Sequence, residues 1–203
     1  MIRDEAYQIL TKYITNKNLL KHCFAAEAGM KAIYRHLHPD GDSEAEEKWG
    51  ITGLLHDIDY QLAQETNQLD KHGSLLFETE PARNASASVA GGPDLLPEDI
   101  TYAIKAHNYE GTKVMPKSDM DWAIAIVDGL TGFIVSCTLI HPDKKLASIT
   151  PEFVLKRLGQ PAFSRNVRRD IINLCDTKLR IPLQEFVQIV LQGMQEIHEE
   201  LGL

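Results

Sequence analysis

The sequence predicts an all-α fold, a single-domain helical bundle, and three observations support this. Apolar residues recur at the three- and four-residue spacing of a helix face, and no stretch shows the sustained alternation of a strand. Prolines, glycines and capping residues divide the chain into segments of helical length. The 203 residues contain no repeat and no low-complexity linker. We therefore expect one domain over 1–203, with a core over about 18–140 and a C-terminal helical extension over about 150–203.

The expected helices follow one another with short connections. They cover residues 4–14, 18–37, 43–58, 82–90, 97–108 and 119–139, followed by three segments that start near Pro151, Pro161 and Pro182. Ser43, with Glu46 three residues later, forms a capping-box pattern at the start of the third helix. Pro97 suits the first position of a helix, and Ser118 is the expected cap of the long helix that follows it.

Charge and cysteine content exclude several functions. The chain holds 29 Asp and Glu against 21 Lys and Arg, and residues 1–100 alone hold 17 acids and 9 bases. This balance argues against a nucleic-acid polymer or an anionic membrane as partner, but it permits a small phosphorylated molecule. Three scattered cysteines and an N-terminus without a signal-peptide core predict a cytoplasmic protein. The longest apolar stretch, residues 122–140, contains Asp128 and is too polar for a membrane span.

Four polar residues interrupt otherwise apolar helix faces: His22, His56, His107 and Asp128. Because a buried carboxylate is costly unless it is paired or bound to a cation, Asp128 needs a partner. The three histidines, and Asp57 beside His56, are candidates, and imidazole with carboxylate suits Zn, Fe, Mn, Ni or Co. The alternative is that each is a satisfied core residue, since helix faces alone do not show that these side chains converge.

The order of these residues resembles the HD-domain superfamily, which is named for its His, His-Asp and Asp metal ligands on an all-α fold. The His-Asp pair lies in Gly-Leu-Leu-His-Asp-Ile-Asp, and the last Asp begins Asp-Gly-Leu-Thr-Gly-Phe-Ile. The resemblance covers nearly the whole chain and is to small stand-alone HD hydrolases. It implies that His22, His56, Asp57 and Asp128 hold a divalent metal, with Mg as a further candidate.

A second metal would need further ligands. Binuclear members of the superfamily add histidines between the His-Asp pair and the last Asp, and His72 and His107 are the candidates here. His107 lies on an apolar stripe, whereas His72 lies in or beside a loop and is equally well explained as a solvent-exposed histidine. In a binuclear site Asp57 would bridge the two metals.

Three other charged residues receive weaker assignments. Asp59, two residues beyond Asp57, is a candidate catalytic residue that orients water, and it could equally cap the loop. Lys71 is the best lysine candidate for binding a substrate phosphate because it lies on the predicted loop. Glu27 falls off the His22 face, so we expect a solvated charge there.

The resemblance implies a metal-dependent phosphohydrolase that acts on a small phosphorylated substrate, such as a nucleotide, through metal-activated water. One alternative is a di-iron oxygenase of the HD type, as in myo-inositol oxygenase, which would require both candidate second-metal histidines. Another is a regulatory protein that binds metal or nucleotide without catalysis. The C-terminal helix has an apolar stripe that fits core packing, and a homodimer is also compatible with it.

Overall fold

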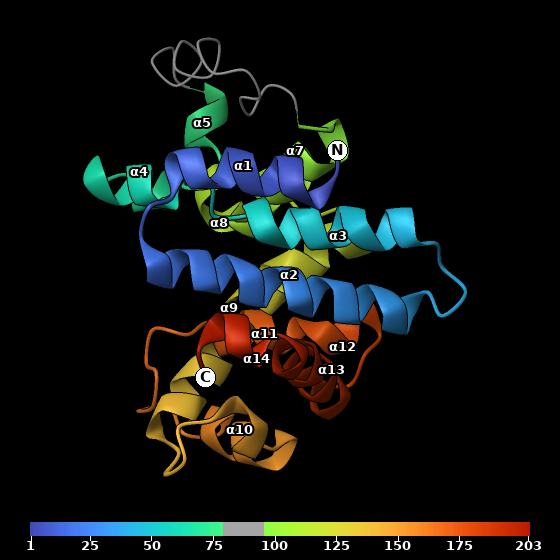
Figure 1. Cartoon of the computed structure of the whole chain (residues 1–203), viewed down its shortest axis with the longest axis vertical. Helices are drawn as coiled ribbons and strands as arrows, with labels where there is room; N and C mark the ends of the chain where they lie inside the picture. The colour runs from blue at the N-terminus through green and yellow to red at the C-terminus, as the bar shows by residue number, and fades with distance from the viewer. Residues whose placement is uncertain (79–95) are drawn as a thin grey trace.

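A computed structural model describes residues 1–78 and 96–203. Every regular element in these residues is a helix, which confirms the predicted all-α fold (Figure 1). The helices are α1 (Arg3–Tyr13), α2 (Lys17–Leu37), α3 (Ser43–Leu55), α4 (Tyr60–Glu65), η1 (Leu69–Lys71), α5 (Leu75–Glu78), α7 (Glu98–His107), α8 (Tyr109–Thr112), α9 (Asp119–Ile140), η3 (Leu146–Ser148), α10 (Pro151–Leu158), α11 (Arg169–Ile172), α12 (Leu174–Leu179), α13 (Leu183–Glu196) and α14 (His198–Leu201). The helix expected over 82–90 lies outside the described residues.

The helix caps agree with the sequence only in part. Ser118 caps α9 as expected, in a capping box with Asp121. The cap of α3 is Asp42 rather than Ser43, because the Asp42 carboxylate accepts a hydrogen bond from the amide of Ala45 at 2.7 Å. Pro97 is likewise the cap of α7 rather than its first residue. The helix signals were therefore correct to within one residue at these ends.

The helix expected to start near Pro161 is absent, and that expectation is wrong. Residues 161–166 form turns, and the next helix, α11, begins at Arg169. The Arg169 guanidinium donates hydrogen bonds to five backbone carbonyls, those of Leu158, Gln160, Phe163, Ser164 and Val167. A single planar donor group thus satisfies the carbonyls that a helix would have used, and it stabilises an irregular loop.

The core centres on α2, α3 and α9. Helix α2 lies between α3 and α13, and α9 packs against α2, α7, α11 and α12 (Figure 1). One apolar cluster joins α2 and α9 to the C-terminal helices, and a second joins α1, α3 and α7. In the described chain, α9 is the one helix long and apolar enough to cross a membrane, so the expectation that Asp128 makes this stretch too polar is wrong by length and composition. Most of the helix is buried in this core.

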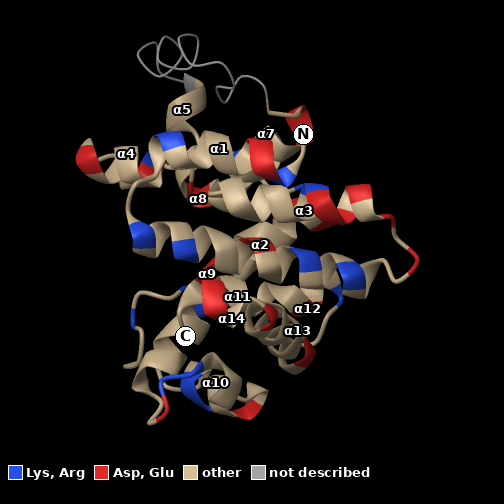
Figure 2. Ribbon diagram, in the orientation of Figure 1, with Lys and Arg blue, Asp and Glu red and all other residues tan. Residues whose placement is uncertain are grey.

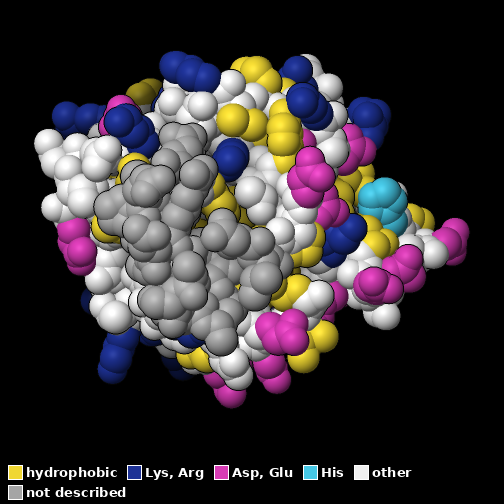
Figure 3. All heavy atoms as spheres, turned by 90° about the horizontal axis from the view of Figure 1, so that it is seen from above, with side chains coloured by type: hydrophobic (Ala, Val, Ile, Leu, Met, Phe, Trp, Pro, Cys, Tyr) yellow, Lys and Arg dark blue, Asp and Glu magenta, His cyan; other side chains and the backbone are white. Residues whose placement is uncertain are grey.

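Charged side chains are interspersed on the outside of the bundle. Figure 2 shows acidic residues along α1, α4 and the start of α3, and basic residues along α2 and near α10. From above, Lys and Arg lie mainly along the upper edge of the view, and Asp and Glu lie mainly along its right and lower edges (Figure 3). These views contain no broad basic surface among the described residues, in agreement with the charge balance of the sequence.

Candidate metal centre

Six side chains from five parts of the bundle come together: His22, His56, Asp57, His72, His107 and Asp128. They come from α2, the end of α3, the residue after η1, the last residue of α7 and the middle of α9. They form two trios, the first of His22, His56 and Asp128 and the second of Asp57, His72 and His107. Within each trio the candidate ligand atoms lie within 4.8 Å of one another. The predicted residues therefore do converge.

The first trio is the more tightly connected. The Nε2 atom of His22 lies 3.0 Å from Oδ1 of Asp128 and 3.2 Å from Nε2 of His56. His56 lies 3.7 Å from the same Asp128 oxygen and is fully buried. Two imidazole nitrogens and one carboxylate oxygen thus face a common point, which is an arrangement typical of a divalent metal ligand set.

Three of the histidines are oriented in the same way. The Nδ1 atoms of His56, His72 and His107 each bond the carbonyl of the residue three positions earlier, at 2.8, 2.7 and 2.5 Å. This fixes each ring and leaves Nε2 to face the cluster, as the outer hydrogen bonds of metal-binding histidines do. In His107 that Nε2 atom is buried and has no hydrogen-bond partner in the part of the chain that the structure describes. A buried polar atom of this kind normally has a partner, and a metal ion would supply one.

Asp57 lies between the two trios. Its Oδ2 atom is 3.5 Å from Nε2 of both His22 and His56. Its Oδ1 atom is 3.8 Å from Nε2 of His72 and 3.6 Å from Nε2 of His107. One carboxylate oxygen therefore faces each trio, which is the geometry of a carboxylate that can bridge two cations.

The charges of the cluster depend strongly on one another. Burial opposes protonation of His56, but the charges of Asp57 and Asp128 outweigh it and raise the pKa of His56 to about 9. Against the opposing effect of its own burial, the charge of His56 and the His107 imidazole, 3.6 Å away, lower the pKa of Asp57 to about 2. Desolvation also opposes ionisation of Asp128, yet hydrogen bonds with His22 and His56 hold its pKa well below its usual range. Both carboxylates therefore carry the negative charge that a cation would bind.

Asp59 supports the site rather than facing it. Its buried carboxylate accepts hydrogen bonds from the amides of Gly73 at 2.7 Å and Leu75 at 2.8 Å. Burial raises the pKa of Asp59, and these two amides oppose that rise. This is the loop-capping role, so the assignment of Asp59 as a catalytic residue is not supported. By holding the segment around Gly73, Asp59 positions His72 beside His107.

Gly73 explains why this loop can approach α7 so closely. Its φ of +89° lies in the left-handed region that favours glycine. A Cβ atom there would lie 2.8 Å from the carbonyl oxygen of Ile104 and 3.1 Å from Cε1 of His107. The Asn108 amide also donates to the carbonyl of His72, at 3.1 Å. His72 is therefore part of the cluster, and the interpretation of it as a solvent-exposed histidine is wrong.

The structure gives Lys71 and Glu27 different environments from those expected from the sequence. Lys71 is exposed, contacts Gln68, and lines neither of the two depressions described below, so the structure does not support a role in binding substrate phosphate. Glu27 is buried, with ion pairs to Arg3 at 2.7 Å and Lys31 at 2.8 Å. The expected solvated charge at Glu27 is wrong, because a cation from α1 and another from its own helix cover the carboxylate.

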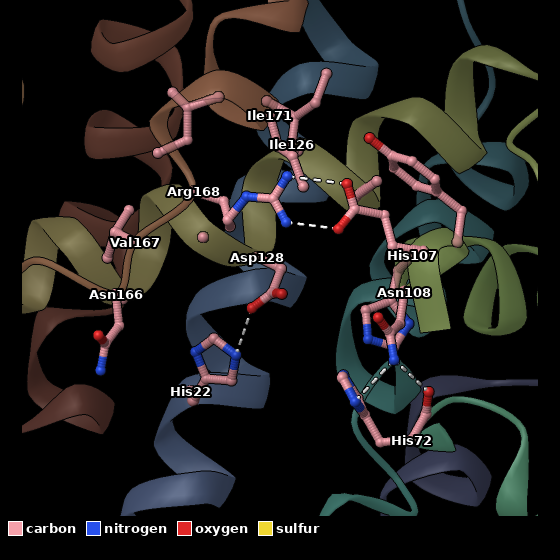
Figure 4. A pocket seen from close by; sticks show the side chains of 16 residues that line it. His22, His72, His107, Asn108, Ile126, Asp128, Asn166, Val167, Arg168 and Ile171 are labelled. Atoms are coloured by element: carbon pink, nitrogen blue, oxygen red, sulfur yellow. Dashed lines mark hydrogen bonds and ion pairs between the residues drawn. The ribbon is translucent and has the colours of Figure 1, made fainter. Parts of the chain in front are cut away.

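A cavity of about 310 Å³ opens beside the cluster (Figure 4). His22, His72, His107 and Asp128 lie at one end, and residues of α9, α11 and the preceding loop form the rest. Arg168 lies on this wall and forms a bidentate ion pair with Glu110 of α8, at 2.6 and 2.9 Å. The sequence did not indicate this cavity, because its far wall depends on the irregular loop that Arg169 stabilises.

A second depression, of about 440 Å³, opens on His22, Asp57, His72 and Asp128. It is more polar and contains Asn16, Asn18, Tyr60 and Gln64. Asp128 faces both depressions, and its side chain is 34% exposed rather than fully buried as the sequence suggested. The candidate metal centre is therefore accessible to a small molecule and to water.

No protein-family model matches the chain, and neither the curated proteins nor the solved structures compared with it give a match. The resemblance to the HD-domain superfamily stays a prediction from the sequence motif.

Proposed function

We propose that the chain is a binuclear metal-dependent phosphohydrolase of the HD type, acting on a small phosphorylated compound. The observation that carries this proposal is the position of Asp57. One of its carboxylate oxygens faces His22 and His56, and the other faces His72 and His107. Four imidazoles and two carboxylates fit Mn, Fe, Co, Ni or Zn, and Mg²⁺ fits less well because it prefers oxygen ligands.

The donor set also fits the requirements of phosphate ester hydrolysis. A divalent metal bound there would polarise a phosphoryl oxygen and lower the pKa of water. In the protein, His22, His56 and Asp128 would hold one ion, and His72 and His107 the other, with Asp57 between them. The polar depression with Asn18 and Tyr60 gives water access to these ligands, and the cavity at Asp128 gives access to substrate.

The proposal is tested by metal content and turnover on the same preparation. We expect about two transition-metal ions per chain by elemental analysis, the number that two separate ligand trios predict. We also expect release of phosphate from phosphomonoesters in a screen with Mn, Co, Ni, Fe and Mg. Absence of phosphate release from fully metallated protein, with any of these ions, would reject the function.

A di-iron oxygenase is the second candidate, because His72 and His107 both join the cluster and that chemistry needs two irons. The Fe(II)-loaded protein would then consume oxygen in the presence of substrate. Metal binding without any turnover would instead favour the regulatory alternative. Oxygen consumption and phosphate release measured side by side therefore separate the three functions.

The same proposal places the protein in a reducing cytoplasmic compartment with a small molecule as its partner. All three cysteines are buried free thiols in the described residues. The net charge of −8 disfavours a nucleic-acid polymer or an anionic membrane.

Metal binding should release protons. In the metal-free protein the pKa of His56 is raised to about 9, so its imidazole is protonated at pH 7 and must lose that proton to bind a cation. We expect release of at least one proton per chain when Mn²⁺ is added at pH 7, and an apparent affinity that rises with pH up to about 9. A pH indicator in weakly buffered solution measures this release. Saturating metal uptake without proton release would contradict the raised pKa.

A further inference from the structure

The cavity beside the candidate metal centre has a floor made by one face of α9. Ala125, Asp128, Gly129 and Gly132 lie on this face, because they are three and four residues apart. Asp128 belongs to the metal centre, and the two glycines continue the same surface away from it. The floor therefore leads directly from a proposed metal ligand into open space.

The packing of the helix does not require either glycine on this floor. A Cβ atom at Gly132 would meet nothing within 4 Å, and one at Gly129 would meet only Ile172, at 3.9 Å. Elsewhere the helical glycines allow close approach: a Cβ atom at Gly29 would lie 2.8 Å from Val127, and one at Gly193 would lie 2.8 Å from the carbonyl of Ala28. Since glycine inside a helix lowers stability relative to alanine, space for a ligand explains the two glycines better than packing does.

The opposite wall determines what kind of ligand fits. Val167 and Ile171 supply apolar surface there (Figure 4), whereas Ile126 and Ile172, which also lie at the cavity, are buried. Among the described residues that line the cavity, Arg168 is the one Lys or Arg, and it is paired with both Glu110 and Asp170. This described lining therefore offers no free lysine or arginine for a second anionic group of the ligand.

The metal end of the cavity is where the phosphate of a ligand would bind. His107 lines this end, its side chain is only 1% exposed, and its buried Nε2 atom, which has no hydrogen-bond partner among the described residues, is the one that the proposed second metal ion would occupy. The ligand should thus have one anionic group at this end and a neutral body over the glycine floor. A volume of about 310 Å³ suits a small molecule.

We propose that Gly129 and Gly132, with Val167 and Ile171, form the subsite for the neutral, apolar part of a phosphomonoester whose phosphate binds at the metal centre. This assignment rests on the proposed function and adds the substrate class: a monophosphate with an apolar body, rather than a compound with a second phosphate or a carboxylate.

The test compares two phosphonates that cannot be hydrolysed. By calorimetry on the Mn²⁺-loaded protein, the affinity for benzylphosphonate should be about tenfold higher than that for methylphosphonate, because only the benzyl group buries apolar surface in the cavity. In Gly132→Leu the affinity for benzylphosphonate should fall about tenfold, while that for methylphosphonate stays unchanged. Gly132→Ala adds one methyl group and should give a smaller loss, so the proposal remains testable if the leucine variant does not fold.

Ser136→Leu is the matched control, because Ser136 lies one turn further along the same face and does not line the cavity. It should leave both affinities unchanged. Equal affinities for the two phosphonates in the wild type, or no loss in both Gly132 variants, would overturn the subsite, as would failure of both phosphonates to bind. Metal content and phosphate release on the same preparation report the proposed function separately. If phosphate is released but the two phosphonates bind equally well, the subsite alone is rejected. If the protein prefers benzylphosphonate but releases no phosphate, hydrolysis alone is rejected.

Discussion

Replacing Asp57 with asparagine should reduce the metal content from about two ions per chain to less than one, and phosphate release to background. The carboxylate is buried and negatively charged, with one oxygen towards His22 and His56 and the other towards His72 and His107, so its loss affects both ions. Loss of an outer hydrogen-bond partner of a metal ligand already costs roughly 10–100-fold in affinity, and loss of a shared ligand should cost more. Elemental analysis after dialysis gives the stoichiometry directly.

Glu27→Gln is the matched control for Asp57→Asn. Glu27 is also a buried carboxylate on the central part of the bundle, but its partners are Arg3 and Lys31 rather than the candidate ligands. We expect this variant to lose stability, because it leaves two cations without their shared anion, and to keep its metal. Two ions per chain in Asp57→Asn would contradict the bridging role of that residue.

The parts of the fold that follow from local pattern could be predicted from the sequence. The long helices α2 and α9 have extended apolar faces and polar or capped ends, and both lie where the spacing placed them. The segment after Pro161 could not be predicted, because its conformation depends on one side chain, Arg169, that bonds five carbonyls along the loop. A tertiary interaction of this kind leaves no periodic signal in the sequence.

The residues of the candidate site also differ in how far the sequence predicts them. His22, His56, His107 and Asp128 stand out in the sequence because each interrupts an apolar helix face, and the structure brings all four together. The role of His72 could not be predicted from the sequence, since this residue follows a short η1 turn whose position is set by Asp59 and Gly73. The charge environment of Glu27 also depends on a cation from another helix, which no helical spacing reveals.

Replacing Asp59 with alanine should remove one of the two metal sites and leave the other. The carboxylate of Asp59 holds the buried amides of Gly73 and Leu75, so its removal leaves two buried donors unsatisfied and releases the segment that carries His72. Each hydrogen bond to a charged group contributes about 1.5–3 kcal/mol, and we expect unfolding by denaturant to show a loss of about 3 kcal/mol or more.

The metal content of Asp59→Ala should fall from about two ions to about one, because the trio of His22, His56 and Asp128 does not depend on this loop. Asp59→Asn is the conservative comparison: its one remaining carbonyl oxygen can still accept from a single amide, so an intermediate loss of stability and of metal should follow. Proton release on metal binding should persist in both variants, since His56 belongs to the retained trio. Loss of both ions in Asp59→Ala would show that the two trios bind metal only as a unit, and retention of both would show that His72 is not needed to hold the second ion.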